Sequence, residues 1–248
     1  EASGRVDVVD RLRVEVLRGD HRLDDLFDDL AHDRGVVHLG RMLRADQHGV
    51  RPFHQAMIDF QSATQNTCLQ LAPRGFGKSS VLNIVRCIFE IIRDPNIRIL
   101  IASNTQLQAD VFLRAIKSHL QYNRLLKEYF GEFYSDEKWD SREICVAPRT
   151  SVAKEATITC VGVGGPVADL VDEENARTEG QREKVRTWYY KTLLPCLEPH
   201  GRLYLVGTRY HYQDLYGHLI KNELAQKHQI VRAIEDDGTT PWPEKYSL

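Results

Sequence analysis

Short apolar runs alternate with longer helical runs from residue 66 onward, and this alternation constrains the fold more than any other feature of the sequence. The short runs are rich in β-branched and aliphatic residues and predict strands, while the longer runs predict helices. Such a chain forms an α/β fold with a mostly parallel central sheet flanked by helices. The predicted strands are 67–72, 97–103, 156–163 and 202–208, and the predicted helices are 80–92, 106–120, 179–194 and 212–226.

Two of the predicted helices differ in how their apolar side chains are distributed. Residues 80–92 are apolar nearly all round, which is typical of a buried helix. In residues 106–120 the apolar side chains fall on one stripe, which we expect to face the core. The members of this stripe are Leu107, Val111, Phe112, Ala115 and Ile116.

Residues 1–50 predict a separate N-terminal helical segment. Its apolar residues recur at the spacing of one helix face, and acidic residues fill the opposite face. Acids side by side on a helix are far more often a solvated face than a metal site. The apolar residues are Leu23, Leu26, Phe27 and Leu30, and the acids are Asp24, Asp25, Asp28 and Asp29.

The composition is that of a soluble globular protein, with 42% hydrophobic and 27% charged residues. The formal net charge of -2 neither predicts nor excludes a nucleic-acid partner, because a balanced total can hide a basic face. The five cysteines never form C-x-x-C, which argues against a zinc site or a disulfide framework and suits a reducing compartment. We expect neither a signal peptide nor a membrane span, because no apolar run reaches the roughly 18 residues that a span needs.

The sequence LAPRGFGKSS, residues 71–80, joins the first predicted strand to the helix that follows it. Its end matches the phosphate-binding pattern G-x-x-x-x-G-K-[ST], although Ala72 stands where the first glycine is expected. Glycine lets backbone N–H groups curl around phosphate oxygens, a lysine adds a charge near the β and γ phosphates, and a serine can hold Mg²⁺. The alternative is a glycine turn that caps a structural helix. The predicted nucleotide contacts are Pro73, Arg74, Gly75, Gly77, Lys78, Ser79 and Ser80.

Phe53 and Gln55 precede this loop and suggest an adenine contact. An aromatic face can stack on a purine, and a side-chain amide can pair with adenine N6 and N7, which favours ATP over GTP. A phenylalanine and a glutamine in an amphipathic helix are otherwise core and surface residues, and that alternative stays open.

An ATPase also needs a carboxylate at a strand end to hold Mg²⁺ and a second one to orient the attacking water. The segment VADLVDEEN, residues 167–175, combines an apolar run with adjacent acids. It supplies the candidate acids Asp169, Asp172 and Glu173.

Three stretches together resemble the ATPase half of tailed-bacteriophage terminase large subunits. They are APRGFGKS, the run from LVDEEN through LVGTRYHYQDLYGHLI, and the closing EDDGTTPWPEKYSL, and the resemblance covers most of residues 50–248. It implies a P-loop NTPase fold and an ATP- and Mg²⁺-dependent motor that packs double-stranded DNA into a procapsid. It also implies that a nuclease domain follows the ATPase, so nuclease activity is not expected in this chain.

The resemblance gives individual residues a role. Arg74 becomes a candidate sensor of the γ phosphate, and Ala72 and Arg74 match a family variant of the loop. In the family, a Thr or Ser after the next strand couples hydrolysis to movement, which nominates Thr208. Arg209 is either a charged loop residue or a contact to phosphate or DNA.

The resemblance also implies domains, partners and a location. The N-terminal segment spans residues 1–50, the ATPase domain 51–235 and the start of a linker 236–248. The expected partners are double-stranded DNA, further copies of the chain in a ring, a portal protein and a small terminase subunit. The expected location is the host cytoplasm during virus assembly, with no membrane contact.

The chain departs from the family between GVGG and DEEN, where about ten residues of the usual pattern are missing. Either the protein has lost this stretch, in which case residues 167–171 form the strand and Asp172 and Glu173 are the acid pair, or the sequence skips a stretch. In the second case Asp169 is the surviving acid. The skipped stretch is the favoured alternative, because a domain of this size has little stability with which to offset the loss of a central strand.

Two other functions fit parts of the pattern. A helicase-like DNA translocase uses the same sheet and the same adenine contact but needs a second motor domain in the same chain. An ATP-dependent ring-assembly module with little hydrolysis fits if the paired acids are truly absent.

Overall fold

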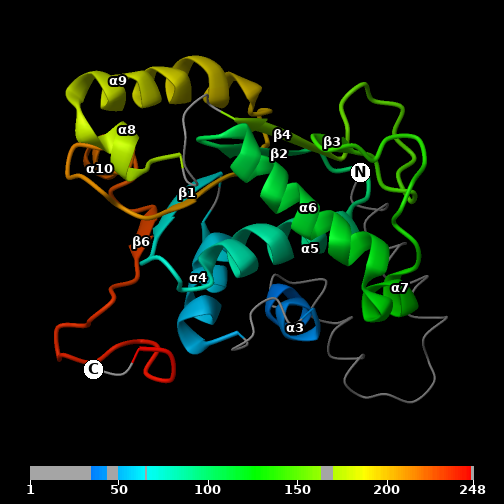
Figure 1. Ribbon diagram of the computed structural model, residues 1–248, viewed down its shortest axis with the longest axis horizontal. Helices are drawn as coiled ribbons and strands as arrows, with labels where there is room; N and C mark the ends of the chain where they lie inside the picture. The colour runs from blue at the N-terminus through cyan, green and yellow to red at the C-terminus, as the bar shows by residue number, and fades with distance from the viewer. Residues whose placement is uncertain (1–34, 44–49, 65, 163–169, 247–248) are drawn as a thin grey trace. The chain divides into compact units, whose positions relative to one another are not determined.

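The computed structural model describes residues 35–43, 50–64, 66–162 and 170–246 (Figure 1). The chain divides into two compact units. The first comprises Glu1–Val50, Ser80–Ala102 and Ala109–Val161, and the second comprises Arg51–Ser79, Ser103–Gln108 and Gly162–Leu248. Residues 72–79, the predicted phosphate loop, therefore belong to the second unit.

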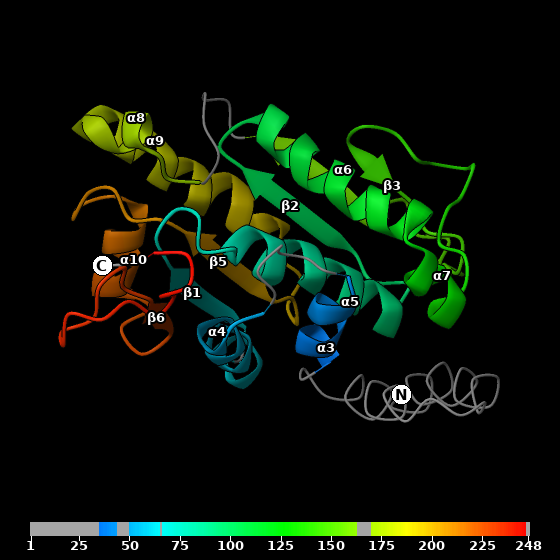
Figure 2. The same ribbon diagram turned by 60° about the horizontal axis from the view of Figure 1, so that its bottom comes forward.

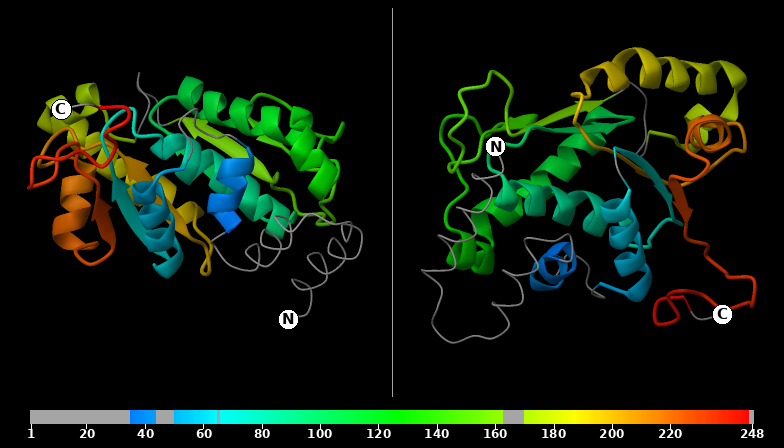
Figure 3. Two further views of the ribbon diagram at one scale, coloured as in Figure 1. Left: turned by 90° about the horizontal axis from the view of Figure 1, so that it is seen from below. Right: turned by 180° about the vertical axis from the view of Figure 1, so that it is seen from behind.

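A parallel sheet with the strand order β5-β1-β6 is the scaffold of the second unit. β1 (Thr67–Leu71) pairs with β5 (Leu203–Gly207) on one side and with β6 (His228–Ile230) on the other, and Figures 2 and 3 show these strands beside one another. Leu71 at the end of β1 is in register with Gly207 of β5. Because the strands run in the same direction, their carboxyl ends meet at one edge, where α/β sheets bind their ligands.

Helix α4 (Pro52–Ala63) is tied to this sheet by a buried glutamine of β1. Gln70 donates from Nε2 to the carbonyl oxygen of Met57 at 2.7 Å and to Oε1 of Gln229 at 2.8 Å. Pro52 is well suited to the first turn of α4, because that turn does not need its N–H group. One buried side chain thus fixes a helix and a neighbouring strand on β1.

The remaining helices of the second unit begin at residues whose side chains accept backbone N–H groups. Asp172 caps α8 (Glu173–Arg177), Thr178 caps α9 (Glu179–Trp188), and Asp214 caps α10 (Leu215–Asn222). Such caps satisfy N–H groups that have no partner inside the helix. After α9 the chain continues through a π-helix, Tyr189–Leu193, and a 3-10 turn, Leu194–Cys196.

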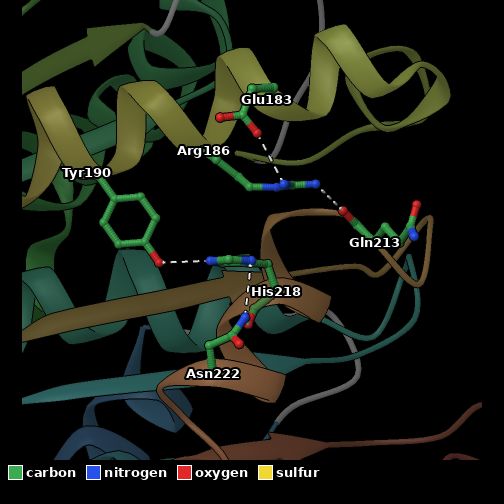
Figure 4. A network of polar contacts seen from close by, with 6 residues as sticks. All are labelled: Glu183, Arg186, Tyr190, Gln213, His218 and Asn222. Carbon is green, nitrogen blue, oxygen red and sulfur yellow. Dashed lines mark hydrogen bonds and ion pairs between the residues drawn. The ribbon is translucent and has the colours of Figure 1, made fainter.

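A polar network joins the α9 region to α10 (Figure 4). Arg186 donates to Glu183 at 3.1 Å and to the carbonyl oxygen of Gln213 at 3.1 Å. Burial and a hydrogen bond to Glu223 raise the pKa of Tyr190 well above its ordinary value. The Tyr190 hydroxyl therefore stays protonated and donates to Glu223, and it accepts from Nε2 of His218 at 3.1 Å.

The first unit contains a sheet with the strand order β2-β4-β3. β4 (Ile158–Gly162) pairs antiparallel with β3 (Glu143–Ile144), and β2 (Ile99–Ser103) lies on its other side. Helix α6 runs alongside β2 in Figure 2. The helices are α3 (Gly35–Met42), α5 (Arg86–Arg93), α6 (Gln106–Tyr122) and α7 (Arg124–Phe130), and a π-helix, Ser79–Val85, leads into α5.

The predicted α/β class, with a mostly parallel sheet flanked by helices, is confirmed. All four predicted strands and all four predicted helices are present, with ends that differ by a few residues. The strands β3 and β6 were not predicted. Within the described residues, no helix combines the length and the apolar character that crossing a bilayer requires. The predicted helix at residues 23–30 lies outside the described residues.

The predicted buried stripe of α6 is partly wrong. Leu107 is 72% exposed and Val111 is 42% exposed, whereas Phe112 and Ile116 are buried as expected. The buried face runs instead through Ala109, Phe112, Leu113, Ile116 and Leu120. It follows the same i, i+3, i+4 spacing, but it is rotated by part of a turn, because the sequence offers two overlapping apolar rows.

The five cysteines are free thiols. Cys68 and Cys160 are buried, whereas Cys196 is exposed. Burial raises the pKa of Cys160 to about 12, so this thiol stays protonated at neutral pH and packs as a small apolar group.

Candidate functional site

The loop after β1 has the backbone shape of an anion-binding nest. Gly75 and Gly77 have φ values of 80° and 67°, a region that residues with a side chain rarely adopt. Phe76 between them is buried. When residues with positive φ lie on either side of a residue with negative φ, successive N–H groups turn toward one concave surface. The helix that begins at Ser79 adds the positive end of its dipole. The loop can therefore receive phosphate oxygens.

Thr208 lies beside the start of this loop. The backbone N–H of Ala72 donates to the carbonyl oxygen of Gly207 at 3.1 Å, and Oγ1 of Thr208 donates to the carbonyl oxygen of Ala72 at 3.0 Å. Two motifs that are far apart in the sequence thus meet at the carboxyl edge of the sheet. A coupling role for Thr208 stays a prediction, and the contact gives it a direct route to the loop.

Two predicted phosphate ligands differ in their exposure. Lys78 is 7% exposed, and its Nζ donates to the carbonyl oxygen of Pro73 at 3.5 Å, a long and weak bond. Arg74 is exposed, and its guanidinium lies 5.3 Å from the ring centre of Tyr210. Arg209 donates to the carbonyl oxygen of Tyr212 at 3.2 Å. Lys78 is therefore a sheltered charge within the loop, and Arg74 is a charge held on its outer side.

The predicted adenine residues already contact protein groups. The ring of Phe53 packs against Phe76 and Trp242, with ring centres 5.5 Å apart in each case. The amide of Gln55 donates to Oδ1 of Asp59 at 2.8 Å, one turn along the same helix. The purine role of both residues stays a prediction.

His54 joins α4 to the phosphate loop. Its Nδ1 accepts the backbone N–H of Arg51 at 3.0 Å, so the proton is carried by Nε2. That nitrogen lies 2.6 Å from the carbonyl oxygen of Phe76 and donates to it. The side chain is fully buried, and the neutral tautomer is therefore fixed by its two partners.

Asp172 is buried and both of its carboxylate oxygens are engaged. Oδ1 accepts the N–H of Asn175 at 2.6 Å, which caps α8, and Oδ2 accepts Nδ2 of Asn104 at 2.5 Å. Glu173, its predicted partner acid, is exposed. Asp169 and the join between residues 165 and 170 lie outside the described residues. The capping box of α8 gives Asp172 a structural role beside its predicted catalytic one.

The substitution Asp172→Asn is expected to lower the free energy of unfolding by about 1–3 kcal/mol, because an amide cannot accept from both Asn104 and Asn175. Urea denaturation followed by circular dichroism measures the change. The matched control is Glu173→Gln next to it, for which a change within about 0.5 kcal/mol is expected. Equal stability of the two variants would contradict the structural role of Asp172.

The sequence did not single out several residues that contact the loop or Asp172. His54 and Asn104 carry no motif of their own, and the C-terminal residues lie in a proline-rich segment without periodicity. The only sequence signal was the density of aromatic residues between 242 and 246. The residues concerned are His54, Asn104, Trp242, Lys245 and Tyr246.

The described residues contain no group of three or more His, Cys, Asp or Glu side chains that is placed to hold a metal ion. Ser79 offers a hydroxyl ligand at the start of its helix, whereas each carboxylate oxygen of Asp172 already accepts one hydrogen bond. No protein-family model matches the chain, and no curated protein matches it.

Proposed function

We propose that the chain binds ATP at residues 72–80 and hydrolyses it as the motor domain of a viral terminase large subunit, with a P-loop NTPase fold. The observation that carries this proposal is the nest formed by Gly75 and Gly77, which follows a parallel strand directly and leads through Lys78 into a helix. Strand, glycine loop, lysine and helix in this order form the structural context in which such a loop holds a triphosphate.

Each residue has a defined task in this proposal. The N–H groups of the loop and Lys78 bind the β and γ phosphates, and Arg74 stabilises the charge that develops on the γ phosphate. Catalysis of phosphoryl transfer consists mainly of such positioning and electrostatic stabilisation. Ser79 and Asp169 would hold Mg²⁺, which when bound neutralises charge on the β and γ phosphates. Asp172 and Glu173 are the alternative acids.

The motor acts on double-stranded DNA together with further copies of the chain in a ring, a portal protein and a small terminase subunit. Thr208 couples ATP hydrolysis in the loop to movement of the segment after β5. Arg209 contacts phosphate or DNA. The host cytoplasm during virus assembly is the proposed location. These assignments rest on the resemblance of the three sequence stretches described above and on the contact between Thr208 and Ala72.

Measurement of ATP hydrolysis with and without double-stranded DNA tests the proposal. We expect hydrolysis that DNA stimulates, with a stimulation that falls steeply as salt concentration rises, because phosphate contacts release counterions. An Asp169→Asn variant that loses turnover but still binds ATP would identify Asp169 as the acid. Absence of both ATP binding and hydrolysis in the wild-type chain would overturn the proposal.

The occupied carboxylate of Asp172 favours a second candidate, an ATP-dependent ring-assembly module with little hydrolysis. Analytical ultracentrifugation with ATP separates the two functions. An assembly module forms rings with ATP at negligible turnover, whereas a motor shows turnover that DNA increases.

A further inference from the structure

Five consecutive carbonyl oxygens of the phosphate loop, from Ala72 to Phe76, each accept a hydrogen bond from a side chain. Thr208 donates to the Ala72 oxygen and Lys78 to the Pro73 oxygen, as described above. The donors to the last three lie before and after the loop in the sequence. These bonds are Tyr246 OH to Arg74 O at 3.4 Å, Lys245 Nζ to Gly75 O at 2.6 Å and His54 Nε2 to Phe76 O at 2.6 Å.

Two of these donors belong to a short C-terminal turn, residues 241–246, which we call the clasp. Trp242 anchors the clasp and is 0% exposed, and its ring centre lies 6.0 Å from that of Phe76. The N–H groups of Lys245 and Tyr246 both donate to the carbonyl oxygen of Trp242, at 3.2 Å and 3.0 Å. The clasp is therefore a folded turn with a buried anchor, and its two donor side chains are held by that turn.

The clasp is fixed to the loop and to α4 by further contacts. The ring of Tyr246 stacks on that of Phe76, with centres 5.1 Å apart and planes 13° from parallel. Glu244 pairs with Arg51 at 3.0 Å. A Cβ atom at Gly75 would lie 2.4 Å from the Tyr246 hydroxyl oxygen, so the loop needs glycine there for the close approach as well as for its φ value.

Holding these carbonyl groups also orients N–H groups. In a planar trans peptide, the C=O of one residue and the N–H of the next point in opposite directions. The bonds to Arg74, Gly75 and Phe76 therefore fix the N–H groups of Gly75, Phe76 and Gly77. These are the N–H groups of the nest, and a nest that is already ordered loses less entropy when an anion binds.

We propose that Lys245, Tyr246 and His54 are positioning residues for the phosphate chain of a nucleoside triphosphate, because they hold three loop carbonyls outward and so aim the nest N–H groups at the ligand. This inference rests on the proposed nucleotide function. Lys245 contributes most to this positioning, since its hydrogen bond is short and its donor is charged. Tyr246 contributes less to this positioning, because its hydrogen bond is long.

The test compares full-length variants in two measurements. Lys245→Met keeps the side-chain length without the ammonium group, Lys245→Arg restores a charged donor, and Tyr246→Phe keeps the stacked ring without the hydroxyl. Isothermal titration with tripolyphosphate measures anion binding without an adenine group, and hydrogen–deuterium exchange of residues 72–79 measures loop order without any ligand. ATP hydrolysis then gives KM and kcat.

We expect Lys245→Met to weaken tripolyphosphate binding about tenfold and to raise KM similarly, with kcat within about threefold of wild type. Tyr246→Phe should weaken binding about twofold to threefold, and Lys245→Arg should recover most of the loss. The exchange of the loop amides should rise in Lys245→Met. The matched controls are Lys221→Met and Tyr122→Phe, at exposed positions, and both should leave all these values unchanged.

The outcomes separate this inference from the proposed function. If wild type binds tripolyphosphate and Lys245→Met matches Lys221→Met in binding and exchange, the positioning role is overturned while the nucleotide site stands. If wild type binds neither tripolyphosphate nor ATP, the proposed function falls, and faster exchange in Lys245→Met alone would then support a purely structural clasp. A loss of kcat with unchanged KM and binding would also contradict the positioning role.

Discussion

An alanine at position 78 is expected to reduce the rate of ATP hydrolysis by at least about 100-fold, which is the usual cost of removing one preorganised electrostatic contact to a transition state. Lys78 is sheltered within the loop, and its Nζ donates to the carbonyl oxygen of Pro73 at 3.5 Å. A hydrogen bond of this length is weak and is readily exchanged for one to a phosphate oxygen. Steady-state turnover with saturating Mg²⁺ and ATP measures the effect.

Two further variants make the Lys78→Ala result specific. Lys221→Ala removes an exposed lysine from the last turn of α10 and should retain full turnover. Lys78→Arg keeps the charge but changes its shape, and we expect a loss nearly as large, since a planar guanidinium does not replace a compact ammonium. The melting temperature of Lys78→Ala should lie within a few degrees of wild type, which would show that the variant is folded. Unchanged hydrolysis in a folded Lys78→Ala protein would remove this loop from the active site.

The substitution Trp242→Ala is expected to lower the free energy of unfolding by about 3–5 kcal/mol, the range for truncating a buried aromatic side chain. The indole is fully buried and contacts the rings of Phe53, His54 and Phe76. In a chain of this length, such a loss corresponds to a fall of roughly 10 °C in melting temperature. Circular dichroism during heating, with urea denaturation as a second measurement, gives both quantities.

Two control variants compare the loss in Trp242→Ala with that of a smaller change at the same position and of a tryptophan elsewhere. Trp242→Phe keeps an aromatic ring in the cluster and should cost about half as much. Trp188→Ala removes a half-buried tryptophan from the end of α9 and should cost less than Trp242→Ala. If Trp242→Ala were as stable as wild type and resisted proteolysis of residues 235–246 equally well, the clasp would not be anchored by this side chain.

The glycine loop at residues 72–79 and the strands around it were predictable because their signals are local. A glycine with positive φ, a lysine and a serine occupy fixed offsets between an apolar strand and a helix, and neither the strand β1 nor the helix that follows depends on distant residues for its pattern. The pairing of β1 with β5 is not local, but parallel βαβ connections make it a natural consequence of the alternation.

The clasp and β6 could not be predicted in the same way. The three residues of β6, His228–Ile230, have no strand pattern of their own and are ordered by pairing with β1. Trp242 lies between two prolines, and only its tertiary contacts show that this segment folds. The sequence therefore indicated a linker where the structure shows a buried anchor.

Asp172 was recognised as an acid, but its capping role was overlooked although its signal was present. An aspartate followed three residues later by an asparagine, at the start of a helix, matches the spacing of a capping box. The adjacent acids favoured a catalytic interpretation, and a catalytic pair and a capping box use the same residue types. Asn104 donates a hydrogen bond to the second carboxylate oxygen of Asp172. It comes from a distant part of the sequence and carries no local signal.

The contact between Thr208 and Ala72 has a mechanical consequence. Asp214 accepts the N–H groups of Tyr210 and His211 at 3.1 Å each while it caps α10, so the segment that follows Thr208 is braced against the first turn of that helix. Through Thr208, the Ala72 carbonyl oxygen is linked to this braced segment and so to α10. The loop and α10 are therefore connected by a continuous series of hydrogen bonds at the carboxyl edge of the sheet.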